Sequence, residues 1–251
     1  MKSIFVLQHT DREDLGAMEP YFRQLDVAVQ YQRPLVTGKV AKSGVNSDGL
    51  VLLGGGAWGT TGSENNERTI LPTLDQELRF TYDHMKRNRP IIAIGLGAQI
   101  ACIAAGGGSE KAAPAFEVCV GRWLDGRRLD GDVADRSLPQ TFPYASIMRD
   151  RPVPPPDAVV LAVDEQDRPL VFQIGRDVLC FTFHPGYSAR MLNSIVEEIR
   201  ADGQKITASL HEAGGHDQAF AVNLGPIMAG ISAFTGWRPE EAVTPAPKPV
   251  V

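Results

Sequence analysis

An apolar run that turns through glycines into a helix is the feature that most constrains this chain. Residues 90–94 (PIIAI) are wholly apolar, Gly95-Leu96-Gly97 forms the turn, and residues 98–105 are small residues that stop at three further glycines. A short run without polar residues is typical of a strand buried on both faces. A sharp strand-to-helix turn presents one residue at the sheet edge, where a cleft can form.

Segments of the same two kinds alternate through the first half of the chain. The patterns predict strands at 3–7, 27–29 and 48–53, and helices at 14–25 and 69–87. Apolar strands that alternate with amphipathic helices indicate a parallel sheet covered on both faces. The predicted fold class is therefore α/β, a doubly wound and mainly parallel sheet.

The second half predicts a partly antiparallel extension of the sheet. Short strands are expected at 116–120, 158–162, 170–174 and 178–183. The last two are expected to form a hairpin across residues 175–177. Helices are expected at 189–200 and 218–234. Residues 151–156 (RPVPPP) are interpreted as a stiff connection. We expect one domain over residues 1–240 and a disordered proline-rich tail over 241–251.

Composition and charge argue against several classes of function. The net charge is −5 and the densest basic stretch, residues 122–128, is short and interrupted by an aspartate, so no nucleic-acid surface is expected. No apolar run is long enough to span a bilayer and no leader is visible, so we expect no membrane partner. The three cysteines, Cys102, Cys119 and Cys180, lie in apolar segments and predict buried free thiols in a cytoplasmic protein.

Two motifs resemble the class I glutamine amidotransferases. Positions 93–99 read A-I-G-L-G-A-Q where that family has G-I-C-L-G-A-Q, so Gly95 stands at the position of the nucleophilic cysteine. Residues 181–186 read F-T-F-H-P-G where the family has Q-F-H-P-E. The resemblance implies that His184 keeps the position of the general base and that Gly186 has lost the carboxylate that orients it.

A glycine-rich turn carries the third part of the resemblance. The family stabilises its tetrahedral oxyanion with backbone N–H groups after a strand, and Gly54, Gly55 and Gly56 follow the predicted strand at 48–53. With Leu96 and Gln99, these glycines are the expected boundary of a ligand cleft. The resemblance covers roughly residues 3–200, extends to the first strand and loop, and is strongest to the amidotransferase half of GMP synthase. It implies a flavodoxin-like fold.

Neither nearby cysteine is expected to replace the missing nucleophile. Cys102 lies about 10 Å along the predicted helix from the turn and should pack against the sheet. Cys180 precedes His184 by four residues on a strand, which separates them by about 13 Å. Both are interpreted as core residues.

These residues favour a pseudoenzyme: a non-catalytic accessory, regulatory or scaffold subunit that lacks the nucleophile and the orienting carboxylate. A homo-oligomer or a protein partner is expected, and the former glutamine cleft could hold a small molecule. The alternative is a hydrolase of glutamine or another γ-glutamyl amide that uses His184 with activated water or a non-standard nucleophile. Its candidate groups are Thr60, Thr61, Ser63, Glu64 and Glu117. A working amidotransferase with an unrecognised thiol is the third reading.

The remaining histidines leave open interpretations. His184 itself is either a catalytic or a structural hydrogen-bonding residue, and His9 is either a cleft liner or a loop residue. His211 and His216 lack the spacing that places two histidines on one helix face for zinc. We therefore expect neither a metal site nor a cofactor.

Overall fold

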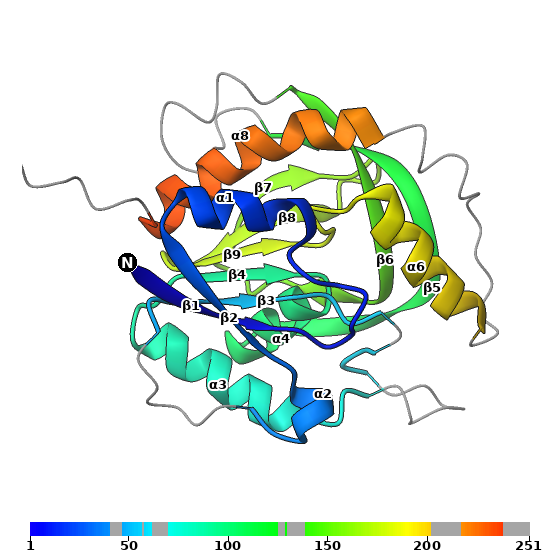
Figure 1. The fold of residues 1–251 in the computed structure, drawn as a ribbon. Helices are drawn as coiled ribbons and strands as arrows, with labels where there is room; N and C mark the ends of the chain where they lie inside the picture. The colour runs from blue at the N-terminus through cyan, green and yellow to red at the C-terminus, as the bar shows by residue number, and fades with distance from the viewer. Residues whose placement is uncertain are drawn as a thin grey trace, which may run out of the picture.

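The fold is described from a computed structural model of the chain, and Figure 1 shows its arrangement. The structure describes residues 1–40, 47–56, 58–61, 70–124, 129, 139–201 and 217–237. The expected tail at 241–251 lies outside these residues, as do Ser63, Glu64, His211 and His216.

A single mixed sheet forms the centre of the described chain. Its nine strands have the order β2-β1-β3-β4-β9-β8-β7-β5-β6. The first five in that order run parallel, and the rest continue antiparallel from β9. The strands are β1 (Lys2–Leu7), β2 (Val27–Gln32), β3 (Gly49–Leu52), β4 (Ile91–Ile94), β5 (Gly108–Trp123), β6 (Thr141–Val153), β7 (Val159–Val163), β8 (Pro169–Ile174) and β9 (Val178–Phe181). The predicted doubly wound α/β class, with its antiparallel second half, is confirmed.

Helices cover both faces of this sheet (Figure 1). One face carries α1 and α8, the other carries α3 and α4, and α6 lies beside β5 and β6. The short elements η1 and α2 follow β1 and β2 in the chain. The helices are η1 (Gly16–Met18), α1 (Glu19–Gln24), α2 (Pro34–Thr37), α3 (Leu74–Lys86), α4 (Leu96–Ala104), α6 (Ala189–Ala201) and α8 (Asp217–Thr235).

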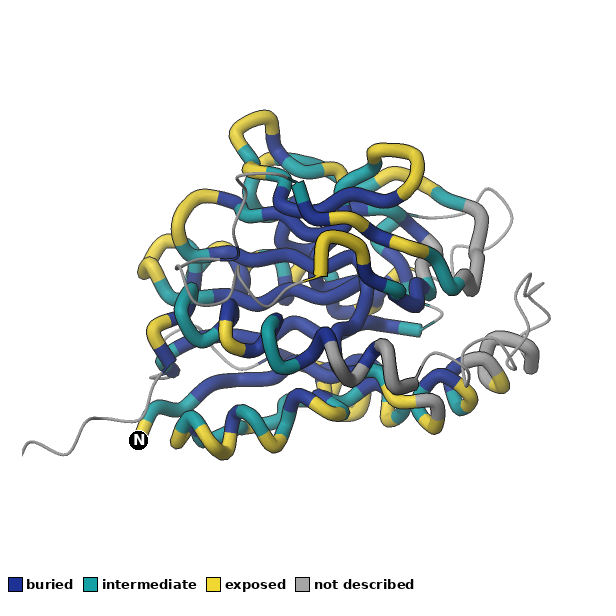
Figure 2. The backbone as a smooth tube through the Cα atoms, turned by 90° about the horizontal axis from the view of Figure 1, so that it is seen from above, coloured by how far each residue is buried: buried dark blue, intermediate teal, exposed yellow. Residues whose placement is uncertain are grey.

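Alternation along β1 shows how one apolar run supplies both layers. Ile4 and Val6 belong to the core under α1 and α8, whereas Phe5 and Leu7 belong to the core under α3 and α4. Successive side chains of a strand point to opposite faces, so a central strand needs apolar residues at every position. Figure 2 shows the resulting continuous buried centre.

The strand order predicts a ligand crevice at one edge of the sheet. The chain adds β2 on one side of β1 and then β3 on the other, so the order reverses between β1 and β3. In open parallel sheets, ligands bind beyond the carboxyl ends of the strands at such a reversal. The segments that follow β1, β3, β4 and β9 all lie at this edge, because these four strands are parallel.

The structure corrects several predicted boundaries. Strand β6 was not expected, and its last residues, 151–153, belong to the segment interpreted as a stiff connection. A proline is tolerated in β6 because β6 is an edge strand of the sheet. Residues 14–15 precede the η1 turn and are not helical, and α3 begins at Leu74, not at residue 69.

The C-terminal helix closes the core through one tryptophan. Trp237 is fully buried after α8, its ring centroid lies 5.8 Å from that of Phe22, and its Nε1–H donates to the Asp48 carbonyl oxygen at 3.3 Å. A side chain at Gly49, the first residue of β3, would overlap the indole. Residues 217–237 are therefore an integral part of the fold.

We predict that Trp237→Ala lowers the free energy of unfolding by about 3–5 kcal/mol, because it leaves a large cavity between α1 and β3. Urea unfolding followed by far-ultraviolet circular dichroism measures this change. Tyr82→Ala is the matched control, since the Tyr82 side chain is 50% exposed. Equal losses in both variants would contradict the prediction.

Candidate functional site

The turn after β4 has a backbone that only glycine adopts readily. Gly95 has φ 55° and ψ −112°, and α4 begins at the next residue, two residues earlier than expected. The Gly95 N–H donates to the Phe181 carbonyl oxygen on β9 at 2.9 Å. A Cβ atom at this position would meet the Gly54 Cα at 3.5 Å, an ordinary contact. A side chain therefore fits here sterically, at a cost in backbone strain of about 1–3 kcal/mol.

The glycine turn after β3 lies directly against the turn after β4, which we call the elbow. Side chains at positions 55 and 97 would overlap Leu96 and Leu52 respectively, so close packing requires glycine at both. The Gly97 N–H donates to the Leu53 carbonyl oxygen at 3.2 Å. The structure thus brings Gly54–Gly56 and Gly95–Leu96 together, as the resemblance implies.

His184 lies after β9 and is 4% exposed. Its Nε2 is 2.7 Å from the Asp14 carbonyl oxygen, which can only accept, and its Nδ1 is 3.0 Å from the Gly186 N–H, which can only donate. The neutral ring therefore carries its proton on Nε2, and its one nitrogen lone pair is used by Gly186. Burial lowers the pKa of His184 to about 4, so the ring is neutral near pH 7.

The space beside His184 is filled by the segment that follows β1. A Cβ atom at Gly186 would lie 2.7 Å from Met18 Cγ and 2.8 Å from the Leu15 carbonyl oxygen. The Ala17 N–H also donates to the Gly186 carbonyl oxygen at 3.0 Å. No side chain fits at position 186 unless Leu15–Met18 moves. On its other side, the His184 ring stacks on Tyr187 with centroids 4.7 Å apart.

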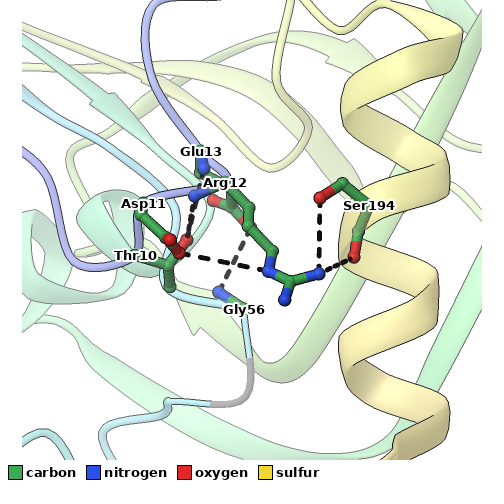
Figure 3. A network of polar contacts seen from close by, with 6 residues as sticks. All are labelled: Thr10, Asp11, Arg12, Glu13, Gly56 and Ser194. Carbon is green, nitrogen blue, oxygen red and sulfur yellow. Dashed lines mark hydrogen bonds and ion pairs between the residues drawn. The ribbon is translucent and has the colours of Figure 1, made fainter.

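The sequence interpretation missed the polar part of this segment, Thr10–Glu13. The Thr10 hydroxyl accepts the Arg12 and Glu13 N–H groups at 3.3 and 3.2 Å. Arg12 reaches α6, where its Nη1 donates to the Ser194 carbonyl oxygen at 2.7 Å (Figure 3). Glu13 is 2% exposed and its Oε1 accepts the Gly56 N–H at 3.1 Å. A buried glutamate among exposed charges has no periodic signal; its position just after a buried strand was the one clue.

His9 proves to be a buried residue at the crevice. Its Nδ1 lies 3.0 Å from the Gly54 carbonyl oxygen and its Nε2 lies 2.7 Å from Glu77 Oε2 on α3. The Thr73 hydroxyl donates to the other Glu77 oxygen at 2.6 Å. Burial alone would lower the pKa of His9, but the Glu77 carboxylate, together with the Gly54 carbonyl oxygen and the Glu13 carboxylate, raises it above its usual value. The protonated ring can donate to both oxygen partners, which holds the glycine turn against α3.

Gln99 forms part of a hydrogen-bonded wall behind the crevice. Its Nε2 donates to the Asp150 carbonyl oxygen at 2.8 Å and its Oε1 accepts the Thr60 hydroxyl at 3.0 Å. The fully buried Asp150 carboxylate accepts the Thr60 and Thr61 N–H groups at 2.8 and 2.9 Å and the Thr61 hydroxyl at 2.8 Å. Both threonine hydroxyls suggested as alternative nucleophiles are therefore engaged in this wall.

The cysteines do not offer a displaced nucleophile at the crevice. Cys102 and Cys180 are buried in the core, as predicted, and they contact each other. Cys119 was also predicted to be buried but is only half-buried. The side chain of Glu117 lies outside the described part of the structure. Among the described residues, no group of three histidine, cysteine or acidic side chains could hold a metal ion.

None of the helices in the described ranges is long and apolar enough to cross a membrane. No protein-family model matches the sequence. No curated protein matches it either.

Comparison with solved structures identifies the fold as that of the class I glutamine amidotransferases. The chain is similar to a glutamine amidotransferase from Thermotoga maritima, with TM-score 0.74, 18% identity, and coverage of 93% of this chain and 98% of the other. It is similar to a glutamine amidotransferase from Methylobacillus flagellatus, with TM-score 0.76, 15% identity, and coverage of 96% and 97%. A putative GMP synthase subunit from Thermoplasma acidophilum matches with TM-score 0.54 and 20% identity over 81% and 98%.

We predict that His184 makes stability fall with acid. The unfolded histidine takes up a proton below pH 6.5, whereas the folded one does so only near pH 4. The stability lost between these values as pH falls is about 3 kcal/mol. Urea unfolding between pH 7 and 4 measures the slope, which should be shallower in His184→Gln. Parallel curves for the two proteins would refute the prediction. His9, whose pKa is raised, acts with the opposite sign and loses its contribution as pH rises above 6.5.

We also predict that Gly186→Ala destabilises the fold by about 1–3 kcal/mol, because the new methyl group collides with Leu15–Met18. Gly108→Ala is the matched control, since its nearest neighbour, Val153 Cβ, is 3.9 Å away. Chemical denaturation compares the two variants. A Gly186→Ala protein as stable as the control would show that the segment after β1 yields easily.

Proposed function

We propose that this chain is a catalytically degenerate relative of the class I glutamine amidotransferases, acting as a non-catalytic accessory, regulatory or scaffold subunit. The observation that carries the proposal is the absence of a nucleophile at an intact elbow. Gly95 keeps the sharp turn at the head of α4 but offers no side-chain atom that can attack an amide carbon. Removal of such a nucleophile costs several orders of magnitude in rate, about 10⁶-fold in a well-studied hydrolase.

The state of His184 supports the same conclusion. A general base needs a lone pair directed at the proton that it removes. The Nδ1 lone pair of His184 accepts the Gly186 N–H, and Nε2 carries the proton given to Asp14. With a pKa of about 4, the ring is also a weak base. His184 is thus better explained as a structural hydrogen-bonding residue than as a retained base.

The alternative, amide hydrolysis by water or another nucleophile with His184, finds little support among the described groups. The Thr60 hydroxyl donates a hydrogen bond to Gln99, and the Thr61 hydroxyl donates one to Asp150. Cys102 and Cys180 are fully buried. A mechanism with a different nucleophile would still need a carboxylate to orient the histidine. The contacts at Gly186 leave no room for that carboxylate.

An accessory role agrees with the structural comparison, since one of the similar structures is a putative subunit of GMP synthase. We infer from this likeness that the chain works with a protein partner or as a homo-oligomer. The free cysteines favour a cytoplasmic location. A small molecule in the crevice bounded by Gly54–Gly56, Gly95, Leu96 and Gln99 remains part of the proposal.

The test is release of ammonia and glutamate from glutamine and a small panel of γ-glutamyl amides. We expect no release by the natural chain beyond that of His184→Ala. We also expect none from Gly95→Cys, because the new thiol would lack a base with an available lone pair. Thiol alkylation by iodoacetamide shows whether the introduced cysteine is accessible. Release by the natural chain that disappears in His184→Ala would overturn the proposal.

A further inference from the structure

The crevice contains a carboxylate supplied by the chain itself. Glu13 lies in the segment after β1 and is 2% exposed. Its Oε1 accepts the Gly56 N–H at 3.1 Å (Figure 3). Gly56 belongs to the turn whose backbone N–H groups would hold an oxyanion under the resemblance to amidotransferases. A carboxylate oxygen on a backbone N–H is a charge-assisted hydrogen bond, stronger than a neutral one.

The packing around Gly54 shows how closely the Glu13 carboxylate approaches the elbow. A side chain at position 54 would overlap Oε2 of Glu13, so glycine is required there for the carboxylate to fit. The same Gly54 Cα is the atom nearest to a Cβ built at Gly95, at 3.5 Å. The carboxylate and the elbow position therefore border one glycine.

Contacts on both sides hold Glu13 in this place. The Thr10 hydroxyl accepts its N–H at 3.2 Å, and the neighbouring Arg12 is tied to Ser194 of α6 (Figure 3). On the following side, the Asp14 carbonyl oxygen accepts the His184 Nε2–H at 2.7 Å. The Glu13 carboxylate also affects Tyr187. Burial of the Tyr187 phenol raises its pKa, and the negative charge of Glu13 raises it further.

We propose that Glu13 is the resident anion of the glycine turn, so that the Thr10–Met18 segment keeps other anions out of it. The inference rests on the proposed non-catalytic function, because catalysis would require this turn to be vacant for an oxyanion. While Glu13 is in place, the Gly56 N–H is already hydrogen-bonded, and the Glu13 charge repels a second small carboxylate or oxyanion. Removing the Glu13 side chain leaves a cavity with an anion-binding N–H, which a small carboxylate such as formate fits.

Chemical rescue tests this proposal on the full chain. Glu13→Ala is melted by differential scanning fluorimetry in sodium formate and in sodium chloride of equal concentration. We expect formate to raise its melting temperature by about 2–4 °C relative to chloride, because an anion that binds only the folded state stabilises it. The natural chain, whose site is filled, should show no such difference. Asp11→Ala is the matched control, since the Asp11 side chain is 92% exposed on the same loop.

Each outcome decides for or against the resident anion. An equal response to formate in Glu13→Ala, Asp11→Ala and the natural chain would overturn the proposal. If Glu13→Ala folds only when formate is present, the proposal is supported. If it folds in neither salt, Glu13→Gln decides: a melting temperature below that of the natural chain supports a bound charge, and one equal to it overturns the proposal. Because these measurements do not depend on glutamine turnover, their failure is distinguishable from failure of the proposed function.

Discussion

The hydrogen bond between the His184 ring and the Asp14 carbonyl oxygen is the contact on which the crevice depends. It joins the carboxyl end of β9 to the segment that follows β1, and these lie on opposite sides of β3 and β4 in the sheet. On either side of Asp14 in the chain, Leu15–Met18 packs against Gly186 and Glu13 reaches the Gly54–Gly56 turn. The Asp14 carbonyl oxygen and the Gly186 N–H together fix the tautomer and orientation of the ring, and burial keeps the ring neutral by lowering its pKa. Leu15 and Met18, which follow Asp14 in the chain, fill the space that a side chain at position 186 would need.

Much of the fold could be predicted because central parallel strands carry an unusually clear pattern. The buried parts of β1, β3, β4 and β9 carry no polar side chain because both faces are covered, and the helices between these strands show a period near 3.6 residues. Strand β6 could not be recognised in this way. It is an edge strand that contains Pro143, Asp150 and two arginines, so neither apolar continuity nor regular alternation marks it. Its partner β5 was shortened in the prediction, since residues 108–115 owe their strand structure to pairing with β6.

The candidate site could be predicted where it depends on glycine and could not where it depends on buried charge. A glycine that follows an apolar strand signals a tight turn, so local sequence predicts the turns at Gly54–Gly56 and Gly95, and the resemblance to amidotransferases suggests their role. Glu13, Glu77 and Asp150 are acidic residues within polar or helical segments, where a carboxylate usually faces solvent. Each is buried because a partner far along the chain satisfies it: Gly56, His9 and the Thr60–Thr61 turn. Such pairs depend on tertiary structure, which no short window of sequence contains.

The contacts of the turn at Gly95 hold it in place without any side chain at that position. The Gly95 backbone angles are fixed by the hydrogen bond to Phe181, and α4 is held against β3 by the close approach of Gly97 to Leu52. Neither contact involves a side chain at position 95. Strain in the backbone of such a turn is usually attributed to catalysis. Here the contacts of the turn with β9 and β3 account for its conformation. Glycine removes the energetic cost of the positive φ and leaves the surrounding structure in place. Glycine at position 95 is therefore compatible with full stability, whereas loss of the turn would require β4, β9 and α4 to repack.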